Sequence, residues 1–265
     1  MDNKAHSTRE EILAYYQARA TTDRYATSPD FHLREIEIEY LARWLQDGVK
    51  ILDVGCGNGY STLRHAAIFD SSFVGIDFVP EMIEAANKKT RQSQLKGKVE
   101  FQVGDVTELQ FREGEFDIVI SERCLLNLPT REDQWQAMKE IARVLKPEGR
   151  YLMLEGTLQG LKRLNEMRTL FGLDPIPEKA AGYNWFSNKF DEEEMFQMAE
   201  TLFEQLEDIQ RFGMYYFISR VLHPLLVAPE QPKYDARINA IARQICGQIP
   251  NYKDLGHVAL FIFRR

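Results

Sequence analysis

A glycine-rich turn after a short apolar run constrains the fold of this chain more than any other feature. Residues 51–54 are apolar apart from Asp53, and three glycines follow at two-residue spacing, ending at Gly59. A helix-like segment then covers residues 60–69. A buried strand that turns through glycines into the start of a helix lets a ligand approach the backbone closely. The stretch therefore predicts the ligand-side turn of a doubly wound α/β sheet.

Strand-like and helix-like segments alternate with short connections from residue 49 onward. This alternation is typical of a parallel sheet with helices on both faces. Strands are predicted at residues 50–54, 72–77, 98–103, 116–121, 150–155 and 257–263, with a long strand region at residues 203–217. Helices are predicted at residues 8–26, 28–48, 60–69, from 80 onward, and at 133–145, 158–170, 191–202 and 234–246.

The spacing of the glycines and the acid before them narrow the choice of ligand. The pattern is Gly-x-Gly-x-Gly, whereas Gly-x-Gly-x-x-Gly is the pattern that cradles a dinucleotide pyrophosphate. Asp53, two residues before the first glycine, suits a cationic or hydroxyl-rich ligand better than a phosphate. Asp77 ends the second predicted strand, 18 positions after Gly59, where a doubly wound sheet places a carboxylate beside a ribose. This carboxylate alone would suit a nicotinamide dinucleotide equally well.

Three motifs resemble those of the class I S-adenosylmethionine-dependent methyltransferases. They are Asp53-x-Gly55-x-Gly57-x-Gly59, Val103-Gly104-Asp105-Val106 and Lys146-Pro147-Glu148-Gly149-Arg150. In that family the acid of the second motif accepts from the adenine amino group, and the third motif is a structural Leu-Lys-Pro-Gly-Gly turn. Glu148 replaces one glycine of that turn here. With Asp77, the motifs occur in the family's order over about two fifths of the chain.

The resemblance implies both a fold and a cofactor. The fold is an α/β, Rossmann-like, doubly wound sheet of seven strands, mostly parallel with an antiparallel strand near the C-terminus, plus helical cap insertions. The cofactor is S-adenosyl-L-methionine, with S-adenosyl-L-homocysteine as its product. We expect it to be bound by Tyr16, Arg24, Asp53, Gly55, Cys56, Gly57, Asp77, Phe78, Met82, Gly104, Asp105, Val106 and Ser121. Asp53 is expected to act indirectly, by accepting from amides of the glycine loop.

We expect a single domain over residues 1–265, because no linker rich in glycine, proline or serine divides the chain. Its expected parts are an N-terminal helical lid at 1–48, a cofactor-binding core at 49–155, cap insertions at 156–190 and 218–252, and a last strand at 256–265. The lid would place Tyr16 over the cofactor, and simple core packing is the alternative for this residue.

The loop after the fourth predicted strand faces the methyl group and the acceptor in the resembled family. Glu122 is therefore the first catalytic candidate, and a structural pairing with Arg123 or a backbone amide is the alternative. His257 and His223 are second candidates, because a positioned histidine can take a proton from an alcohol or ammonium nucleophile. A structural role is the alternative for each histidine. The fifth strand lacks the paired Asp-Asn that holds a divalent ion in catechol-type enzymes, so no metal site is predicted.

The two insertions should form the cap that selects the acceptor. The residues that we expect to contact the acceptor are Arg123, Asn127, Arg168, Asn184, Trp185, Tyr216 and Arg220. Arginines that face one pocket would suit a carboxylate or a phosphate, whereas solvated surface arginines are the alternative reading.

Charge and composition exclude some classes of partner. A net charge of −7 argues against a mainly electrostatic grip on nucleic acid. Three widely spaced cysteines predict neither a disulfide framework nor a zinc site, and the polar N-terminus predicts no signal peptide. The longest apolar stretch is too short to span a bilayer. We expect a cytoplasmic protein that binds a small molecule, without nucleic acid or membrane, as a monomer or homodimer.

Methylation of an oxygen or nitrogen atom of a small polar metabolite, including a sugar or saccharide precursor, is the leading hypothesis. Three alternatives stay open at this point. They are a methyltransferase that acts on RNA or protein, a binding module that uses S-adenosylmethionine without turnover, and a nicotinamide-dependent oxidoreductase. The glycine spacing disfavours the last of these.

Overall fold

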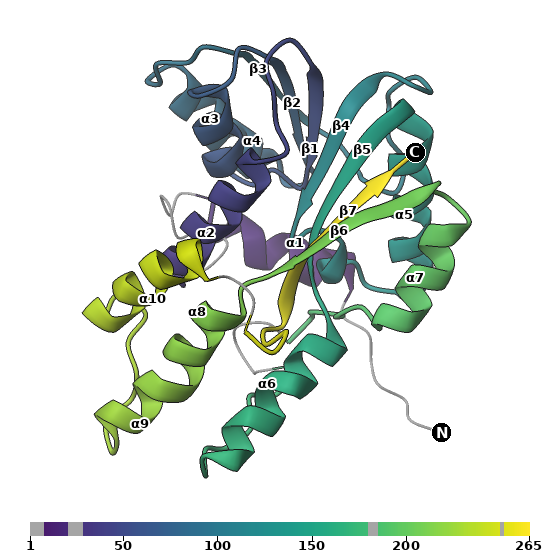
Figure 1. Cartoon of the computed structure of the whole chain (residues 1–265). Coiled ribbons are helices and arrows are strands. Elements are labelled where there is room, and N and C mark those ends of the chain that lie inside the picture. The colour runs from purple at the N-terminus through teal and green to yellow at the C-terminus, as the bar shows by residue number, and fades with distance from the viewer. Residues whose placement is uncertain (1–7, 21–28, 180–184, 250–251) are drawn as a thin grey trace.

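A mixed β-sheet forms the centre of the molecule (Figure 1). The computed structural model describes residues 8–20, 29–179, 185–249 and 252–265. Within these ranges the strands are β1 (Lys50–Val54), β2 (Ser72–Asp77), β3 (Lys98–Val103), β4 (Phe116–Glu122), β5 (Leu145–Gly156), β6 (Gln205–Arg211) and β7 (Val258–Arg264). Their order is β3-β2-β1-β4-β5-β7-β6. The neighbours among β1 to β5 are parallel, and β7 runs antiparallel to both β5 and β6, which confirms the predicted sheet.

Helices cover both faces of the sheet and extend beyond the carboxyl ends of its parallel strands (Figure 1). They are α1 (Arg9–Gln17), α2 (Phe31–Ala42), α3 (Tyr60–Ala66), α4 (Pro80–Thr90), η1 (Leu125–Asn127), α5 (Arg131–Val144), α6 (Leu158–Leu170), α7 (Glu192–Glu200), α8 (Gly213–Phe217), η2 (Ile218–Leu222), α9 (His223–Val227) and α10 (Arg237–Gln248). We call α6, α8, η2, α9 and α10 the cap. None of the described helices is both long and apolar enough to cross a lipid bilayer.

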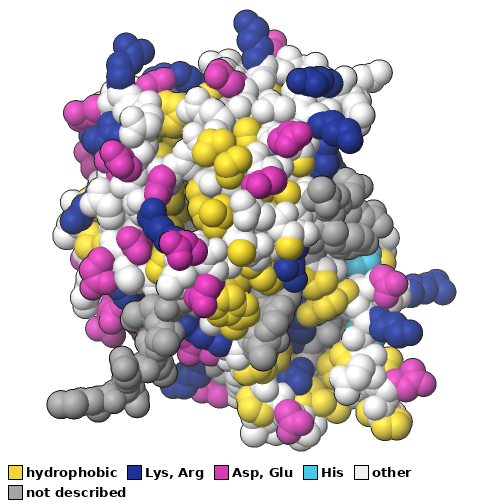
Figure 2. Space-filling model, turned by 180° about the vertical axis from the view of Figure 1, so that it is seen from behind, with side chains coloured by type: hydrophobic (Ala, Val, Ile, Leu, Met, Phe, Trp, Pro, Cys, Tyr) yellow, Lys and Arg dark blue, Asp and Glu magenta, His cyan; other side chains and the backbone are white. Residues whose placement is uncertain are grey.

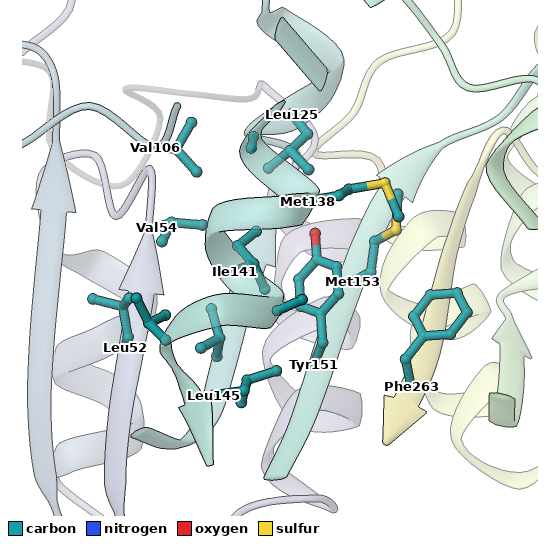
Figure 3. Close-up of a cluster of buried hydrophobic side chains, with 14 of the residues drawn as sticks. Leu52, Val54, Val106, Leu125, Met138, Ile141, Leu145, Tyr151, Met153 and Phe263 are labelled. Atoms are coloured by element: carbon teal, nitrogen blue, oxygen red, sulfur yellow. The ribbon is translucent and has the colours of Figure 1, made fainter. Parts of the chain in front are cut away.

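Alternate residues of the central strands face two separate hydrophobic cores. Leu52 of β1 packs in the core under α5, whereas Ile51 points to the opposite core under α2 and the cap. Figure 3 shows Met138 and Ile141 of α5 beside Tyr151 of β5 in the first of these cores. Because both faces are buried, β1 and β2 read as nearly continuous apolar runs. The bounds of β1, β2 and the more exposed edge strand β3 are as predicted.

Helix α1 lies across the end of the sheet where the parallel strands finish (Figure 1). The side chain of Thr8 accepts a hydrogen bond from the backbone N–H of Glu11, and the side chain of Glu11 accepts one from the backbone N–H of Thr8. These two bonds form a capping box. Its residue Tyr16 packs with Met82 of α4. The helix is shorter than the predicted segment at 8–26, since it ends at Gln17, and residues 21–26 of that segment lie outside the described residues.

The predicted strand region at residues 203–217 is wrong in its second half. β6 ends at Arg211, and the chain then forms α8. Phe212, Tyr215 and Tyr216 are fully buried, and their spacing of three and four residues brings them to one face of a helix. A short apolar run fits a strand or a helix equally well by pattern, so packing against the core under α2 decides the outcome.

Helix α6 starts in close contact with the loop that leads into β7. Gly160, in its first turn, lies so near the carbonyl group of Gly256 that a Cβ atom at this position would overlap it. Gly256 has a φ of 110° and packs against the ring of Tyr216. The two cap insertions are thus joined through glycine backbone at the edge of the sheet.

Replacement of Gly160 by alanine should lower the free energy of unfolding by about 1–3 kcal/mol, because the added methyl group forces α6 away from a backbone carbonyl. Gly247 of α10 is the matched control, since it is exposed and no atom lies near its Cβ position. Alanine there should be neutral or raise stability by up to about 1 kcal/mol through helix propensity. Urea unfolding measures both, and a Gly160→Ala protein as stable as the wild type would contradict this packing.

Candidate active site

The carboxyl ends of β1, β2 and β4 meet where the strand order reverses, because β1 pairs with both β2 and β4. Doubly wound sheets bind their ligands in the crevice at this point. Gly55, Gly57 and Gly59 of the loop after β1 have φ angles of 72°, 54° and 73°, which side chains rarely allow. Gly55 and Cys56 donate their backbone N–H groups to the carbonyl oxygen of Ile76, so the loop is fixed against β2.

Asp77 ends β2 and holds the glycine loop from the other side. One carboxylate oxygen accepts from the N–H of Gly57 at 2.9 Å, and the other accepts from the N–H of Val79 at 3.0 Å. Burial raises the pKa of Asp77 to about 6, although these two hydrogen bonds oppose the shift. Each oxygen keeps a second lone pair for a further donor.

A crevice runs over the exit loops of β1, β2 and β4. Its two ends share the lining residues Gly55, Asp77, Phe78, Cys124 and Asn127. One end, which we call the Asp105 end, is also lined by Arg9, Ile12, Gly104, Asp105 and Val106. The other, which we call the Glu122 end, is also lined by Tyr16, Gly57, Met82, Glu122 and Arg123.

Two contacts of α1 close over this crevice. Arg9 forms an ion pair with Asp105, whose other oxygen accepts from the amide and hydroxyl of Thr107 at 2.8 and 2.7 Å. Although burial acts to raise it, the hydrogen bonds from Thr107 and Arg9 hold the pKa of Asp105 below its ordinary value. At the Glu122 end, the hydroxyl of Tyr16 accepts from the side-chain amide of Asn127 at 3.0 Å.

Charged side chains from two strands and a helix lie at or beneath the Glu122 end. Glu122 forms an ion pair with Arg34 of α2 at 3.8 Å, and both side chains are almost fully buried. Asp53 accepts from the hydroxyl of Thr62 at 2.5 Å, and burial raises the pKa of Asp53 to about 7. The partner of Asp53 in the described residues is therefore this hydroxyl, and not the loop amides that the sequence suggested.

Arg123 forms its ion pair with Glu37 of α2, at 3.1 Å, and not with the neighbouring Glu122. Glu37 is fully buried; burial raises its pKa to about 7, and the charge of Arg123 opposes this shift. Arg123 has a φ of 53°, which is uncommon for a residue with a side chain. Its backbone N–H donates to the carbonyl oxygen of Leu154 at 2.7 Å, which fixes this conformation against β5.

A larger cavity of about 600 Å³ lies under the cap. Its walls come mainly from α6, η2, α9 and the segment at residues 228–234, and we call it the cap cavity. Arg123, Lys189 and His257 line both this cavity and the crevice. These three side chains therefore border both spaces, and we call them the junction.

His257 contributes an imidazole to the junction, one residue before β7 begins. Burial lowers the pKa of His257 well below its ordinary value, and the charges of Lys189 and Arg220 act in the same direction. The ring is therefore neutral near pH 7. Its Nδ1 atom has no hydrogen-bond partner in the described part of the chain. The ring of Tyr216 packs edge-on against it, with 5.1 Å between ring centroids.

Most of the residues proposed from the sequence line one of these spaces. Those that line the crevice are Tyr16, Gly55, Gly57, Asp77, Phe78, Met82, Gly104, Asp105, Val106, Glu122, Arg123, Asn127 and His257. Those that line the cap cavity are Arg123, Arg168, Arg220, His223 and His257. Asp53, Cys56, Ser121, Trp185 and Tyr216 line neither space. Arg24 and Asn184 lie outside the described residues.

The side chains that line neither space have other partners. The hydroxyl of Ser121 bonds that of Tyr151 at 2.8 Å inside the sheet. Cys56 packs in a small core under α3 and α4, and Trp185 packs edge-on against Phe186. The described residues contain no cluster of three or more His, Cys, Asp or Glu side chains that could hold a metal ion.

Lys189 and Arg9 are the main site residues that sequence reasoning missed. Lys189 reaches the junction because the next residue, Phe190, donates its N–H to the carbonyl oxygen of Gly156 at 2.9 Å, and Asn188 is bonded to Leu126. These contacts join segments that are far apart in the sequence, so no local sequence pattern predicts them. For Arg9, the capping signal at Thr8 predicts a helix but not its contact with Asp105.

Comparisons with known proteins agree with this geometry. A family model described as a methyltransferase domain matches residues 51–149. The chain is 34% identical over 106 residues to 27-O-demethylrifamycin SV methyltransferase from Amycolatopsis mediterranei, a match that covers 40% of this chain and 38% of that protein. It is 34% identical over 142 residues to demethylmenaquinone methyltransferase from Leptospira interrogans, which covers 50% of this chain and 55% of that protein.

The solved structures that resemble this chain include an S-adenosylmethionine-dependent methyltransferase from Methanosarcina mazei. The superposition of the two chains has a TM-score of 0.58 with 20% sequence identity, and it covers 85% of this chain and 96% of that one. The chain spans about half the length of the curated relatives that it matches. The family model falls on residues 51–149, which include the exit loops of β1, β2 and β4. Residues 51–149 thus match a methyltransferase domain, and the sheet order, glycine loop and Asp77 of the chain are similar to those of the class I S-adenosylmethionine-dependent methyltransferases.

Proposed function

We propose that the chain transfers a methyl group from S-adenosylmethionine to an oxygen or nitrogen atom of a small polar metabolite, a class that includes sugars and saccharide precursors. One observation carries this proposal: Arg123, Lys189 and His257 line both the crevice and the cap cavity. A cofactor in the crevice and an acceptor in the cap cavity would meet at these side chains. Methyl transfer is an in-line displacement, so a fixed arrangement of the two reactants supplies much of its rate.

The residues of the crevice fit the cofactor. Asp77 has a free lone pair on each oxygen for the two ribose hydroxyls, since each oxygen accepts one backbone N–H group. The Asp105 end, with the apolar side chains of Ile12 and Val106, would hold the adenine ring. The loop at Gly55 and its following glycines lets the methionine part lie against bare backbone.

Bound S-adenosylmethionine supplies a methyl group on a positively charged sulfonium. Asp53 and Glu122 place carboxylates near the Glu122 end of the crevice, and Arg34 balances the second of these. A carboxylate-rich surround favours a cation and disfavours an anion. These groups would therefore hold the sulfonium end of the cofactor at the Glu122 end.

His257 is the residue that we assign as the general base. An alcohol or ammonium acceptor must lose a proton during transfer, and a positioned base contributes about 10²–10⁴-fold to the rate. The imidazole lines both spaces and is neutral near pH 7, so it can receive this proton. Glu122 is committed to Arg34, and we assign it to the cofactor. His223 lines only the cap cavity, and we assign it to acceptor binding.

The names of the relatives and the shape of the site support a small acceptor. The name of the Amycolatopsis protein specifies an oxygen atom of a small molecule, and an oxygen acceptor in this chain would need the base at the junction. A cavity of about 600 Å³ is within the usual range for sites of small molecules. Figure 2 shows basic and acidic side chains interspersed on the face opposite to that of Figure 1, which is unlike a nucleic-acid surface.

The proposed activity predicts that labelled methyl groups from S-adenosylmethionine appear in the small-molecule fraction of a metabolite extract. Parallel incubations with tRNA and with histones test the two macromolecular alternatives, and product analysis by mass spectrometry identifies the methylated atom. Label in tRNA or histones alone would overturn the proposal. Binding of S-adenosylhomocysteine without methyl transfer to any of these materials would favour a non-catalytic binding module.

Asp77→Asn should weaken binding of S-adenosylhomocysteine by about 10- to 100-fold. The amide NH₂ group places a donor where the carboxylate offered an acceptor to the ribose, so a buried donor faces another donor. Asp70, an exposed residue before β2, provides the matched control, and Asp70→Asn should bind as the wild type does. Titration calorimetry measures both affinities. Equal affinity of Asp77→Asn and wild type would remove Asp77 from the cofactor site.

Binding of S-adenosylhomocysteine should also depend on pH through Asp77. Its pKa is raised to about 6 in the folded protein, so the carboxylate becomes protonated as the pH falls through this value and loses an acceptor site. Affinity should therefore fall toward tenfold per pH unit below about pH 6. Calorimetry over this range checks the slope, which the Asp77→Asn variant should lack.

His257→Gln should lower kcat by about 10²–10⁴-fold through loss of the base, with little change in the affinity for S-adenosylhomocysteine. The acceptor found by the extract experiment serves as substrate. His223→Gln is the comparison variant, and it should raise the KM for the acceptor more than it lowers kcat. An unchanged kcat for His257→Gln would show that the proton leaves by another route.

A further inference from the structure

Of the lysines and arginines that line the cap cavity, Lys233 is exposed, and the other four fall into two groups. Arg123 is paired with Glu37 at 3.1 Å, and Arg220 is paired with Asp30, whose other oxygen accepts from Tyr215 at 2.6 Å. Each of these arginines therefore already has a carboxylate partner within the fold. Lys189 and Arg168 form no ion pair with any described residue.

Lys189 is the more unusual of the two, because it is buried at the junction. Only 5% of the residue is exposed, and its Nζ atom donates to the backbone carbonyl oxygen of Glu178 at 2.6 Å. Its aliphatic stem lies along Gly156, at the end of β5. Burial lowers the pKa of Lys189 to about 8; the charge of Glu178 acts to raise this pKa, and the charge of Lys179 acts to lower it. The ammonium group therefore stays charged near pH 7.

Arg168 brings a second cation to the same cavity from α6. Its Nε donates to the carbonyl oxygen of Asp174 at 2.8 Å, and another nitrogen donates to the carbonyl oxygen of Arg220. Two backbone carbonyls leave further N–H groups of a guanidinium available. The carboxylate of Asp174 lies on an exposed residue, close enough to act on Arg168 but not paired with it.

A charged group taken out of water costs several kcal/mol unless an opposite charge accompanies it. Among the described residues, no carboxylate lies within ion-pair distance of Lys189, although the charge of Glu178 acts on it. The site therefore leaves room for a counter-charge from outside. We propose that the methyl acceptor is an oxyanion, whose carboxylate or phosphate group binds Lys189, with Arg168 as the second cation of the cap cavity. This inference rests on the proposed function, in which the cap cavity receives the acceptor.

The position of Lys189 also determines where the nucleophile of a bound acceptor lies. Lys189 and His257 line the same junction, so an acceptor anchored by its oxyanion presents its nucleophile near the imidazole. An uncharged analogue leaves the buried ammonium group with its backbone hydrogen bond but without an ion-pair partner. The site therefore rejects neutral isosteres by loss of this interaction, which discriminates more strongly than a missing apolar contact.

Calorimetric titration of the protein saturated with S-adenosylhomocysteine tests the proposal with three probes: benzoate, its neutral isostere benzamide, and inorganic phosphate. We expect benzoate or phosphate to bind at least tenfold more tightly than benzamide. Lys189→Met should remove this difference, whereas Lys162→Met, which deletes an exposed charge on α6, should leave it unchanged. Whichever anion binds more tightly identifies the oxyanion as a carboxylate or a phosphate.

Two results would overturn the proposal. One is equal or absent binding of both anions and benzamide to the wild type, and the other is wild-type anion binding by a folded Lys189→Met protein. A thermal melt checks the fold of the variant, whose melting temperature should match or exceed that of the wild type because a buried unpaired charge has been removed. Titration with S-adenosylhomocysteine alone and the extract experiment report on the proposed function separately, since neither depends on Lys189 binding these probes.

Discussion

The crevice depends on one carboxylate that joins two strands. Asp77 accepts backbone N–H groups from Gly57, after β1, and from Val79, after β2. Both loops leave the sheet at the reversal of strand order, where the N–H groups of Gly55 and Cys56 also bond the carbonyl oxygen of Ile76. The carboxylate adds a side chain that bonds both loops at once. The same side chain lines the crevice, so Asp77 both holds the loops and would supply the ribose contact that we propose. This double use explains why the carboxylate is buried at a cost.

Other acids of the site carry the same free-energy cost of burying a carboxylate. Burial raises the pKa of Asp53, Glu37 and Glu155 to about 7, and that of Asp77 to about 6. Because the folded form of each group binds its proton more tightly than the unfolded chain does, its contribution to stability falls as the pH rises through these values. The fold keeps these acids because they pin loops: Glu155 alone accepts the N–H groups of three successive residues that lead into and form η1.

The sequence predicted the parts whose patterns are local. Strands β1 to β3 and helix α6 have the predicted bounds, because the apolar runs of β1 and β2, the polar-apolar alternation of the edge strand β3 and the helix cap at Thr157 are short-range signals. Residues 213–217 did not follow the prediction, since an apolar run acquires its helical form only from the core that it meets. The glycine loop and the position of Asp77 at the end of β2 could also be predicted, because they too follow from a local sequence pattern. Lys189 was not, because its position depends on pairing with a strand that ends 33 residues earlier.

The register of the antiparallel strand has a consequence for the cap. Gly156, the last residue of β5, pairs with Val258, the first residue of β7. One cap insertion leaves the sheet at the first of these residues, and the other returns to it at the second. Segments between them can lengthen, shorten or change composition while His257 keeps its place beside the crevice. In the function that we propose, the architecture would thus separate the choice of acceptor, made by the cap, from the geometry of transfer, held by the sheet register.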